Sequence, residues 1–139
     1  MIRKNNIIIN IAILLFLLSV TFILSSCNAI EPRIELAEVN EFEILILESF
    51  PVQVHVVASG NLPNPCTGID QIIQSRDENN FKITIKIKYN QEICIPLINP
   101  FEETIALDVY GLPAGTYNVN VNGIEDSFIL EVDNTYQTI

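Results

Sequence analysis

The stretch that decides the fold is Phe81-Lys82-Ile83-Thr84-Ile85-Lys86-Ile87-Lys88-Tyr89. Aromatic and aliphatic residues occupy every odd-numbered position, and lysine or threonine occupies every even one. Successive side chains of a β-strand point to opposite faces, so this period of two gives the segment one apolar and one polar face. The stretch therefore predicts a strand that lies between a hydrophobic core and solvent.

The same alternation recurs along the rest of the chain. Clear alternating segments run over 52–58, 105–109, 117–121 and 128–132, and less regular candidates run over 34–39, 43–48 and 69–76. No segment after residue 33 keeps a helical period. Seven or eight short strands separated by turn residues predict an all-β domain, either a sandwich or a small barrel.

Turn residues mark the breaks between these segments. Asn122-Gly123 stands between two alternating runs, and both residue types tolerate positive φ, which predicts a two-residue hairpin. We expect a loop with two prolines over Gly60–Pro65, a polar turn at Asp77–Asn80 and a proline-limited connection over Pro96–Pro100. The strands are therefore expected to be short and locally connected.

A more specific pattern lies in Tyr110-Gly111-Leu112-Pro113-Ala114-Gly115-Thr116-Tyr117-Asn118-Val119. Leu112 and Gly115 precede Tyr117, which opens an alternating run. This arrangement resembles the E–F corner of immunoglobulin-like and fibronectin type III-like domains, in which the tyrosine hydroxyl bonds back to the corner backbone. The resemblance implies a single immunoglobulin-like β-sandwich of about seven strands. The chain departs from antibody domains in containing no tryptophan.

The N-terminus carries a different signal. Arg3 and Lys4 precede an apolar run over 7–23 and the sequence Leu24-Ser25-Ser26-Cys27. Positive charge followed by an apolar core and small residues is typical of a secretory signal peptide. The last four residues resemble the lipobox of bacterial lipoproteins. That resemblance implies attachment of diacylglycerol to the Cys27 thiol, cleavage before Cys27, and an acyl chain such as palmitate on the new amine.

These signals divide the chain into a cleaved signal peptide over 1–26, a lipidated tether over 27–32, a β-sandwich over 33–134 and a tail over 135–139. The expected location is a cell membrane or an outer membrane, with the domain outside the cytoplasm. An uncleaved transmembrane helix is the alternative, because an apolar stretch of about 18 residues is just long enough to span a bilayer.

Lipidation of Cys27 leaves Cys66 and Cys94 as an even pair in an oxidising compartment, which predicts a disulfide between them. The bridge closes a loop of about 28 residues and contributes roughly 3–4 kcal/mol in the chain-entropy model. Because both cysteines precede the tyrosine corner, the bridge is expected to join the loop after the second strand to the loop before strand E. A metal site or a catalytic thiol is the alternative, although His55 is the only histidine.

The segment Asn64-Pro65-Cys66-Thr67-Gly68 partly resembles the N-P-T-T-G loop of chagasin-like cysteine protease inhibitors, which are also immunoglobulin-like. The resemblance implies a loop that enters a protease cleft, with Asn64, Pro65, Thr67 and Gly68 as candidate binding residues. This chain lacks the glycine-rich segment and the R-P-W motif of that family. A proline-shaped loop before a disulfide is the alternative.

Charge excludes several classes of partner. The chain has 7 basic and 17 acidic residues, for a net charge of −10. Cleavage removes Arg3 and Lys4, which leaves 5 basic residues, 17 acidic residues and a net charge of −12. Such a chain is expected to repel nucleic acid and anionic lipid head groups. Lys82, Lys86 and Lys88 are expected to share one strand face, on which they dock an acidic partner, touch lipid head groups or guard an exposed strand against edge pairing.

No catalytic or metal site stands out in the sequence. His55 alternates with valines and is expected to be structural, and the acid pairs Asp77-Glu78 and Glu125-Asp126 are expected in turns without the ligand spacing of a dedicated calcium site. We therefore expect neither an enzyme nor a cofactor besides the lipid on Cys27. The expected function is a membrane-anchored binding or structural domain at the bacterial cell envelope, with an envelope protein or glycan as partner. Chagasin-like protease inhibition is the alternative.

Overall fold

The computed structural model describes residues 7–16, 33–91 and 93–136. The chain divides into two compact units, Met1–Glu31 and Pro32–Ile139. The first unit contains a helix over residues 7–16. Within the described ranges, no helix has the length and apolar content needed to span a membrane.

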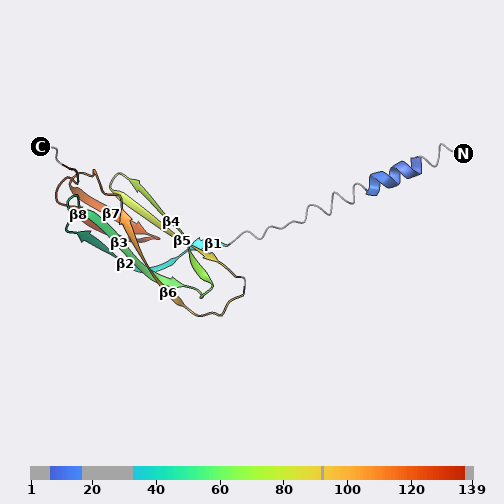
Figure 1. Cartoon of the computed structure of the whole chain (residues 1–139), viewed down its shortest axis with the longest axis horizontal. Coiled ribbons are helices and arrows are strands. Elements are labelled where there is room, and N and C mark those ends of the chain that lie inside the picture. The colour runs from blue at the N-terminus through green and yellow to red at the C-terminus, as the bar shows by residue number, and fades with distance from the viewer. Residues whose placement is uncertain (1–6, 17–32, 92, 137–139) are drawn as a thin grey trace. The chain divides into compact units, whose positions relative to one another are not determined.

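The second unit is a sandwich of two β-sheets (Figure 1). In chain order its strands are β1 (Ile34–Leu36), β2 (Glu38–Leu47), β3 (Gln53–Leu62), β4 (Thr67–Asp77), β5 (Asn80–Tyr89), β6 (Asn99–Leu107), β7 (Gly115–Val121) and β8 (Ile124–Leu130). The predicted all-β sandwich is therefore confirmed.

Strand β5 is the centre of the larger sheet. The smaller sheet has the antiparallel order β2-β3-β6, whereas the larger one contains β1, β4, β5, β7 and β8. Along one edge of β5, β4 pairs antiparallel over its whole length. The other edge is shared, because β7 pairs in parallel with Asn80–Ile83 and β1 pairs antiparallel with Lys86–Lys88.

The alternation of β5 forms the middle of the core. Phe81, Ile83, Ile85 and Ile87 are each at most 4% exposed, and the residues between them lie on the outer face. They form one cluster with the inward-facing residues of β3, β6, β7 and β8. Full burial of such an aliphatic side chain contributes about 1.5–3 kcal/mol relative to exposure.

The tyrosine corner predicted from the sequence is confirmed. The hydroxyl of Tyr117 donates a hydrogen bond to the carbonyl oxygen of Pro113 at 2.8 Å. The ring is 1% exposed and packs against Phe81 and Phe128, with centroid distances of 6.1 and 5.5 Å. Leu112 is buried beside the same core. The corner therefore fixes the crossover from β6 in one sheet to β7 in the other.

The Asn122-Gly123 turn is also confirmed, and Asn122 does more than turn the chain. Both residues have positive φ, 47° and 100°. The Asn122 side-chain oxygen accepts from the Ile85 amide at 2.9 Å, and its nitrogen donates to the carbonyls of Ala37 and Ile85, each at 2.9 Å. This amide fills the gap on β5 between β7 and β1, so it joins three strands.

A second asparagine ties the end of the chain to the sandwich. The side chain of Asn134 is 0% exposed, donates to the carbonyls of Val52 and Val109, and accepts from the Val52 amide. Its backbone pairs with Gly111 and Leu112. Asn134 therefore holds together the β2–β3 connection, the tyrosine corner and the segment after β8.

Some predicted boundaries are wrong. Residues 60–62 belong to β3, where they pair with β6. A Cβ at Gly60 would lie 2.0 Å from the carbonyl oxygen of Glu38, so glycine permits the close approach of β2 to β3 here. Pro100 lies in β6, an edge strand where a missing amide donor is tolerated. Strand β8 ends at Leu130, and Val132 is 56% exposed. The polar turn at Asp77–Asn80 is confirmed.

The hypothesis that Lys82, Lys86 and Lys88 guard an exposed strand edge is wrong. They project from β5, which is paired on both edges. Alternation in a sequence identifies the face on which a side chain lies, but it contains no information on the neighbours of the strand. The lysines therefore lie in the middle of the outer face of the larger sheet.

We expect Asn122→Gly to lower the free energy of unfolding by about 1–3 kcal/mol, since glycine keeps the positive φ but leaves the buried Ile85 amide without its partner. Urea denaturation measures the change. Glu125→Ala on the exposed face of the same hairpin is the control and should stay within about 0.5 kcal/mol of the parent. An Asn122→Gly protein as stable as the parent would show that this side chain does not join the strands.

Candidate functional site

The strands bring the loops together at two opposite ends of the sandwich. At the first end, called here the β1 end, Ile34 pairs with Lys88 and Leu62 pairs with Asn99. The connections over 63–66 and 90–98 therefore lie there. At the other end, called here the C-terminal end, lie the connections over 48–52, 78–79 and 108–114 and the segment 131–136.

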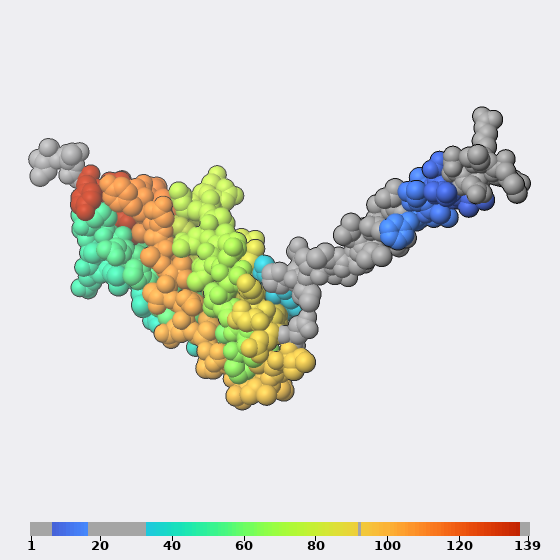
Figure 2. Space-filling view, turned by 45° about the vertical axis from the view of Figure 1, so that its right-hand side comes forward, coloured from blue at the N-terminus to red at the C-terminus, as the bar shows by residue number. Residues whose placement is uncertain are grey.

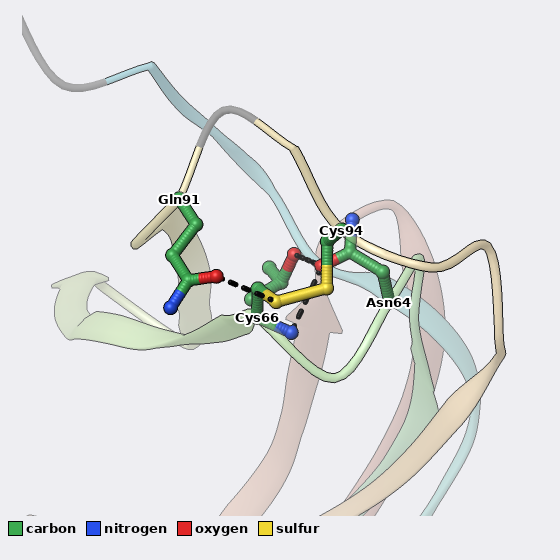
Figure 3. The surroundings of a disulfide bond; sticks show 5 residues. Asn64, Cys66, Gln91 and Cys94 are labelled. Atoms are coloured by element: carbon green, nitrogen blue, oxygen red, sulfur yellow. Dashed lines mark hydrogen bonds between the residues drawn. A yellow bond between two sulfur atoms is a disulfide. The ribbon is translucent and has the colours of Figure 1, made fainter.

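The predicted disulfide is confirmed and lies at the β1 end. Cys66 and Cys94 are bonded, with their Cα atoms 6.1 Å apart and 28 positions apart in sequence. The bridge joins the residue before β4 to the β5–β6 connection (Figure 3). The oxygen of Gln91 lies 3.5 Å from the Cys66 sulfur; the contact is not a hydrogen bond, because a disulfide sulfur carries no proton. The bridge thus fastens one loop of this end to the other.

The candidate binding loop over Asn64–Gly68 is held by its own hydrogen bonds. The side-chain oxygen of Asn64 accepts from the Cys66 amide at 3.0 Å and from the Thr67 hydroxyl at 2.9 Å (Figure 3). Thr67 is 4% exposed. Gly68 belongs to β4, where it pairs with Lys88, and Pro65 is exposed. Pro65 is therefore the part of this loop that is free to contact a partner.

The β5–β6 connection carries an apolar surface that the sequence analysis treated only as a proline-limited link. Ile93, Ile95, Leu97 and Ile98 are 89%, 65%, 59% and 68% exposed. The signal was present in the sequence, because four large aliphatic residues within six positions are too many for an ordinary polar connection. The residues 93–98 are called the apolar loop below.

A small polar cluster fastens β1 beside this loop. The Tyr89 hydroxyl donates to a carboxylate oxygen of Glu35 at 2.8 Å, and Arg33 pairs with the other oxygen. The guanidinium carbon of Arg33 lies 5.2 Å from the centroid of the Tyr89 ring. The hydrogen bond from Tyr89, assisted by Arg33, lowers the pKa of Glu35, and the same bond raises the pKa of Tyr89. Glu35 is therefore ionised at neutral pH and holds a cation at the β1 end.

The C-terminal end carries a second exposed surface. Phe50, Tyr110 and Tyr136 are 58%, 60% and 65% exposed, and Tyr136 lies 6.3 Å from Phe50 and 6.1 Å from Tyr110 between ring centroids. The three residues are called the aromatic cluster below. They come from three segments far apart in the chain, so sequence reasoning missed them.

A groove of about 600 Å³ runs beside the aromatic cluster. Ile46, Ile129 and Val132 are among the aliphatic residues that line it, and Glu48 and Glu131 are its acidic lining residues. A lining with both apolar and acidic residues is suited to a partner that offers apolar side chains and basic groups.

The remaining sequence candidates form no site. His55 is half-buried on β3, opposite Leu45 and Ala106. The pair Asp77-Glu78 lies at the β4–β5 turn, whereas Glu125-Asp126 lies in β8 and not in a turn as expected. In the part of the chain that the structure describes, no three His, Cys, Asp or Glu side chains gather in a way that could hold a metal ion. Cys27 lies outside the described residues.

Comparisons with known proteins point to one family. Residues 56–130, from β3 to the end of β8, match the family model described as the ORF11 beta-sandwich domain. The uncharacterized 10.2 kDa protein in the HgiCIIM 5′ region of Herpetosiphon aurantiacus is 33% identical over 88 residues, which are 63% of this chain and 93% of the relative. The corresponding protein in the HgiBIM 5′ region is 32% identical over 83 residues, 59% of this chain and 100% of the relative. No solved structure matches the chain significantly.

Loss of the bridge is expected to destabilise the sandwich. In a Cys66→Ser, Cys94→Ser double variant the unfolded chain regains the freedom of a 28-residue loop, which lowers the free energy of unfolding by roughly 3–4 kcal/mol. Urea titrations with and without reductant measure this. The parent should weaken on reduction and the double variant should not respond; a parent that is insensitive to complete reduction would contradict a structural role for the bridge.

Proposed function

We propose that this chain, which belongs to the family of ORF11 beta-sandwich domains, is a lipoprotein, anchored through Cys27, that displays its sandwich as a binding domain at a bacterial cell envelope. The proposal joins two features of one chain. One is the lipobox-like sequence ending at Cys27, and the other is a disulfide-bonded domain that begins a few residues later.

The observation that carries the proposal is the pairing of the cysteines. The chain has three cysteines, and the bond between Cys66 and Cys94 leaves Cys27 as the unpaired one. Structural disulfides persist in exported proteins and are rare in the reducing cytosol. An exported chain with one remaining cysteine directly after Leu24-Ser25-Ser26 has the composition expected of a lipidated protein.

The lipid supplies the membrane affinity that the domain lacks. Each buried CH₂ group contributes about 0.8 kcal/mol, so one acyl chain holds a protein only marginally, whereas two or three chains on one residue hold it stably. Cys27 precedes Arg33 by six residues. These residues span at most roughly 20–22 Å when fully extended, so the domain stays beside the bilayer.

The tether also gives the sandwich a direction. It enters at β1, so the C-terminal end is the one that faces away from the bilayer. Strand β3 has 10 residues and is about 33 Å long at 3.3 Å per residue, which separates the two ends. Aromatic side chains offer a large contact area at low entropic cost and dominate binding energy in many interfaces. We therefore assign partner binding to the aromatic cluster and its groove, with an envelope protein as the partner.

Replacement of the lipidated residue tests the anchor. We expect Cys27→Ser to move the protein from the membrane fraction to the soluble fraction and to abolish incorporation of labelled palmitate. The Cys66→Ser, Cys94→Ser double variant is the matched control, since it also replaces cysteines by serine but should remain lipidated and membrane-bound. A Cys27→Ser protein that still fractionates with membranes would refute the anchor.

Replacement of two exposed rings tests the binding surface. The partner for this test is an envelope protein recovered by cross-linking to the lipidated parent. A Tyr110→Ser, Tyr136→Ser double variant should bind this protein more weakly by a factor of roughly ten or more. The reason is that truncation of an aromatic residue that dominates an interface typically costs about 2 kcal/mol or more of binding free energy. Lys82→Ser on the outer face of β5 is the control. Equal affinities for the parent and the double variant would exclude the aromatic cluster as the binding surface.

Protease inhibition through the Asn64–Gly68 loop is the alternative function. The loop offers it little support, because Asn64 and Thr67 bond to each other and Thr67 is buried. The loop also lies at the end where the tether enters, so a protease would have to approach between the sandwich and the bilayer. Inhibition of a papain-like protease that disappears on Gly68→Val substitution would favour this alternative over the binding domain.

A further inference from the structure

We propose that the apolar loop (residues 93–98) inserts its aliphatic side chains into the surface of the bilayer to which the chain is anchored. The sandwich would then have two points of contact with the membrane, the lipid and the loop. This inference rests on the lipid anchor proposed above and adds an orientation to it.

The apolar loop exposes more hydrophobic surface than a soluble connection needs. Its four aliphatic side chains are between 59% and 89% exposed, and its sequence Ile93-Cys94-Ile95-Pro96-Leu97-Ile98 contains no charged residue. Single exposed apolar residues are common on soluble proteins, whereas contiguous ones mark an interaction surface. The loop therefore has the chemistry of a segment that leaves water when the protein is in place.

The loop is held in shape before it meets any partner. The Cys94–Cys66 bond fastens it to the residue before β4. Pro96 fixes one backbone dihedral, and the Leu97 amide donates to the Ile95 carbonyl at 2.9 Å. A preformed loop loses little conformational entropy on insertion, so most of the free energy of transferring its side chains from water is retained.

The loop lies at the end of the sandwich that the tether enters. Ile34 pairs with Lys88, and two residues further along, the Asn90 amide donates to the Cys66 carbonyl at 3.0 Å. Figure 2 shows the yellow segment that contains the loop projecting at the same end as the cyan strand β1. With a tether of at most roughly 20–22 Å, the bilayer surface is within reach of this end.

Cations and carboxylates are both present near the β1 end of the domain. Lys86 and Lys88 lie on β5 close to this end, where cations favour lipid phosphate groups, whereas Arg33 is already paired with Glu35. Glu92, which lies outside the described residues, is the acid nearest to the loop in sequence. Glu48 and Glu131 line the groove at the C-terminal end, where carboxylates oppose contact with a phospholipid surface. Glu38 and Glu102 also lie near the β1 end, so the apolar loop and the short tether, rather than charge, assign the lipid surface to this end.

A fluorophore placed on the loop tests the inference, because the chain contains no tryptophan. Leu97→Trp and Ile95→Trp are introduced separately into the full chain, and each lipidated protein is reconstituted into phosphatidylcholine vesicles, with or without bromine on the acyl chains. Interfacial insertion to a depth of about 5–10 Å should shift emission to shorter wavelength and lower its intensity in the brominated vesicles. Tyr110→Trp in the aromatic cluster is the control and should show neither change.

The possible outcomes distinguish failure of loop insertion from failure of the lipid anchor. If the proteins float with the vesicles and have the lipidated mass, but neither loop tryptophan responds to bromine, the inserted loop is overturned and the anchor stands. If quenching at the loop equals quenching at Tyr110→Trp, the orientation is overturned. If the proteins neither carry lipid nor float, the anchor fails and the inference fails with it.

Discussion

The sandwich depends on a strand edge that two separate segments share. Along one side of β5, β7 pairs with Asn80–Ile83 and β1 pairs with Lys86–Lys88, and the Asn122 amide bonds to Ile85 between them. Because β1 is the first strand of the sandwich, this contact would also connect the proposed point of membrane attachment to the core. A buried backbone group left unpaired here would cost about 1–3 kcal/mol, a large fraction of the stability of a small domain.

Much of the fold could be predicted from local sequence patterns. The alternation over 81–89 predicts β5 and its buried face, and the resemblance of the segment around Tyr117 to the E–F corner of immunoglobulin-like domains implies the hydrogen bond that Tyr117 makes. The bridging role of Asn122 could not be predicted, because its partners Ile85 and Ala37 are 37 and 85 positions away. The prediction that Lys82, Lys86 and Lys88 guard an exposed strand edge is wrong for the same reason. A period of two identifies the face of the strand on which a side chain lies, but not the strands that pair with it.

The candidate site also has parts that the sequence predicts and parts that it does not. An even pair of cysteines, together with the export expected from the N-terminal sequence, suffices to predict the bond between Cys66 and Cys94. The aromatic cluster could not be predicted, because Phe50, Tyr110 and Tyr136 come from three separate segments of the chain. Hydrogen bonds of Asn134 hold these segments together in the folded domain. The aliphatic residues of the apolar loop are visible in the sequence, but Pro96 and the nearby Pro100 suggest an ordinary connection, and local patterns contain no information on exposure.

The two ends of the sandwich thus have different chemistry, and in the function proposed above the tether determines which of them faces the bilayer. The most direct measurement of this central claim is the intact mass of the protein purified from the membrane fraction. Lipid anchoring predicts a mature chain that begins at Cys27 and carries the added mass of diacylglycerol and a further acyl chain. A chain that still begins at Met1, or one with an unmodified Cys27, would contradict it.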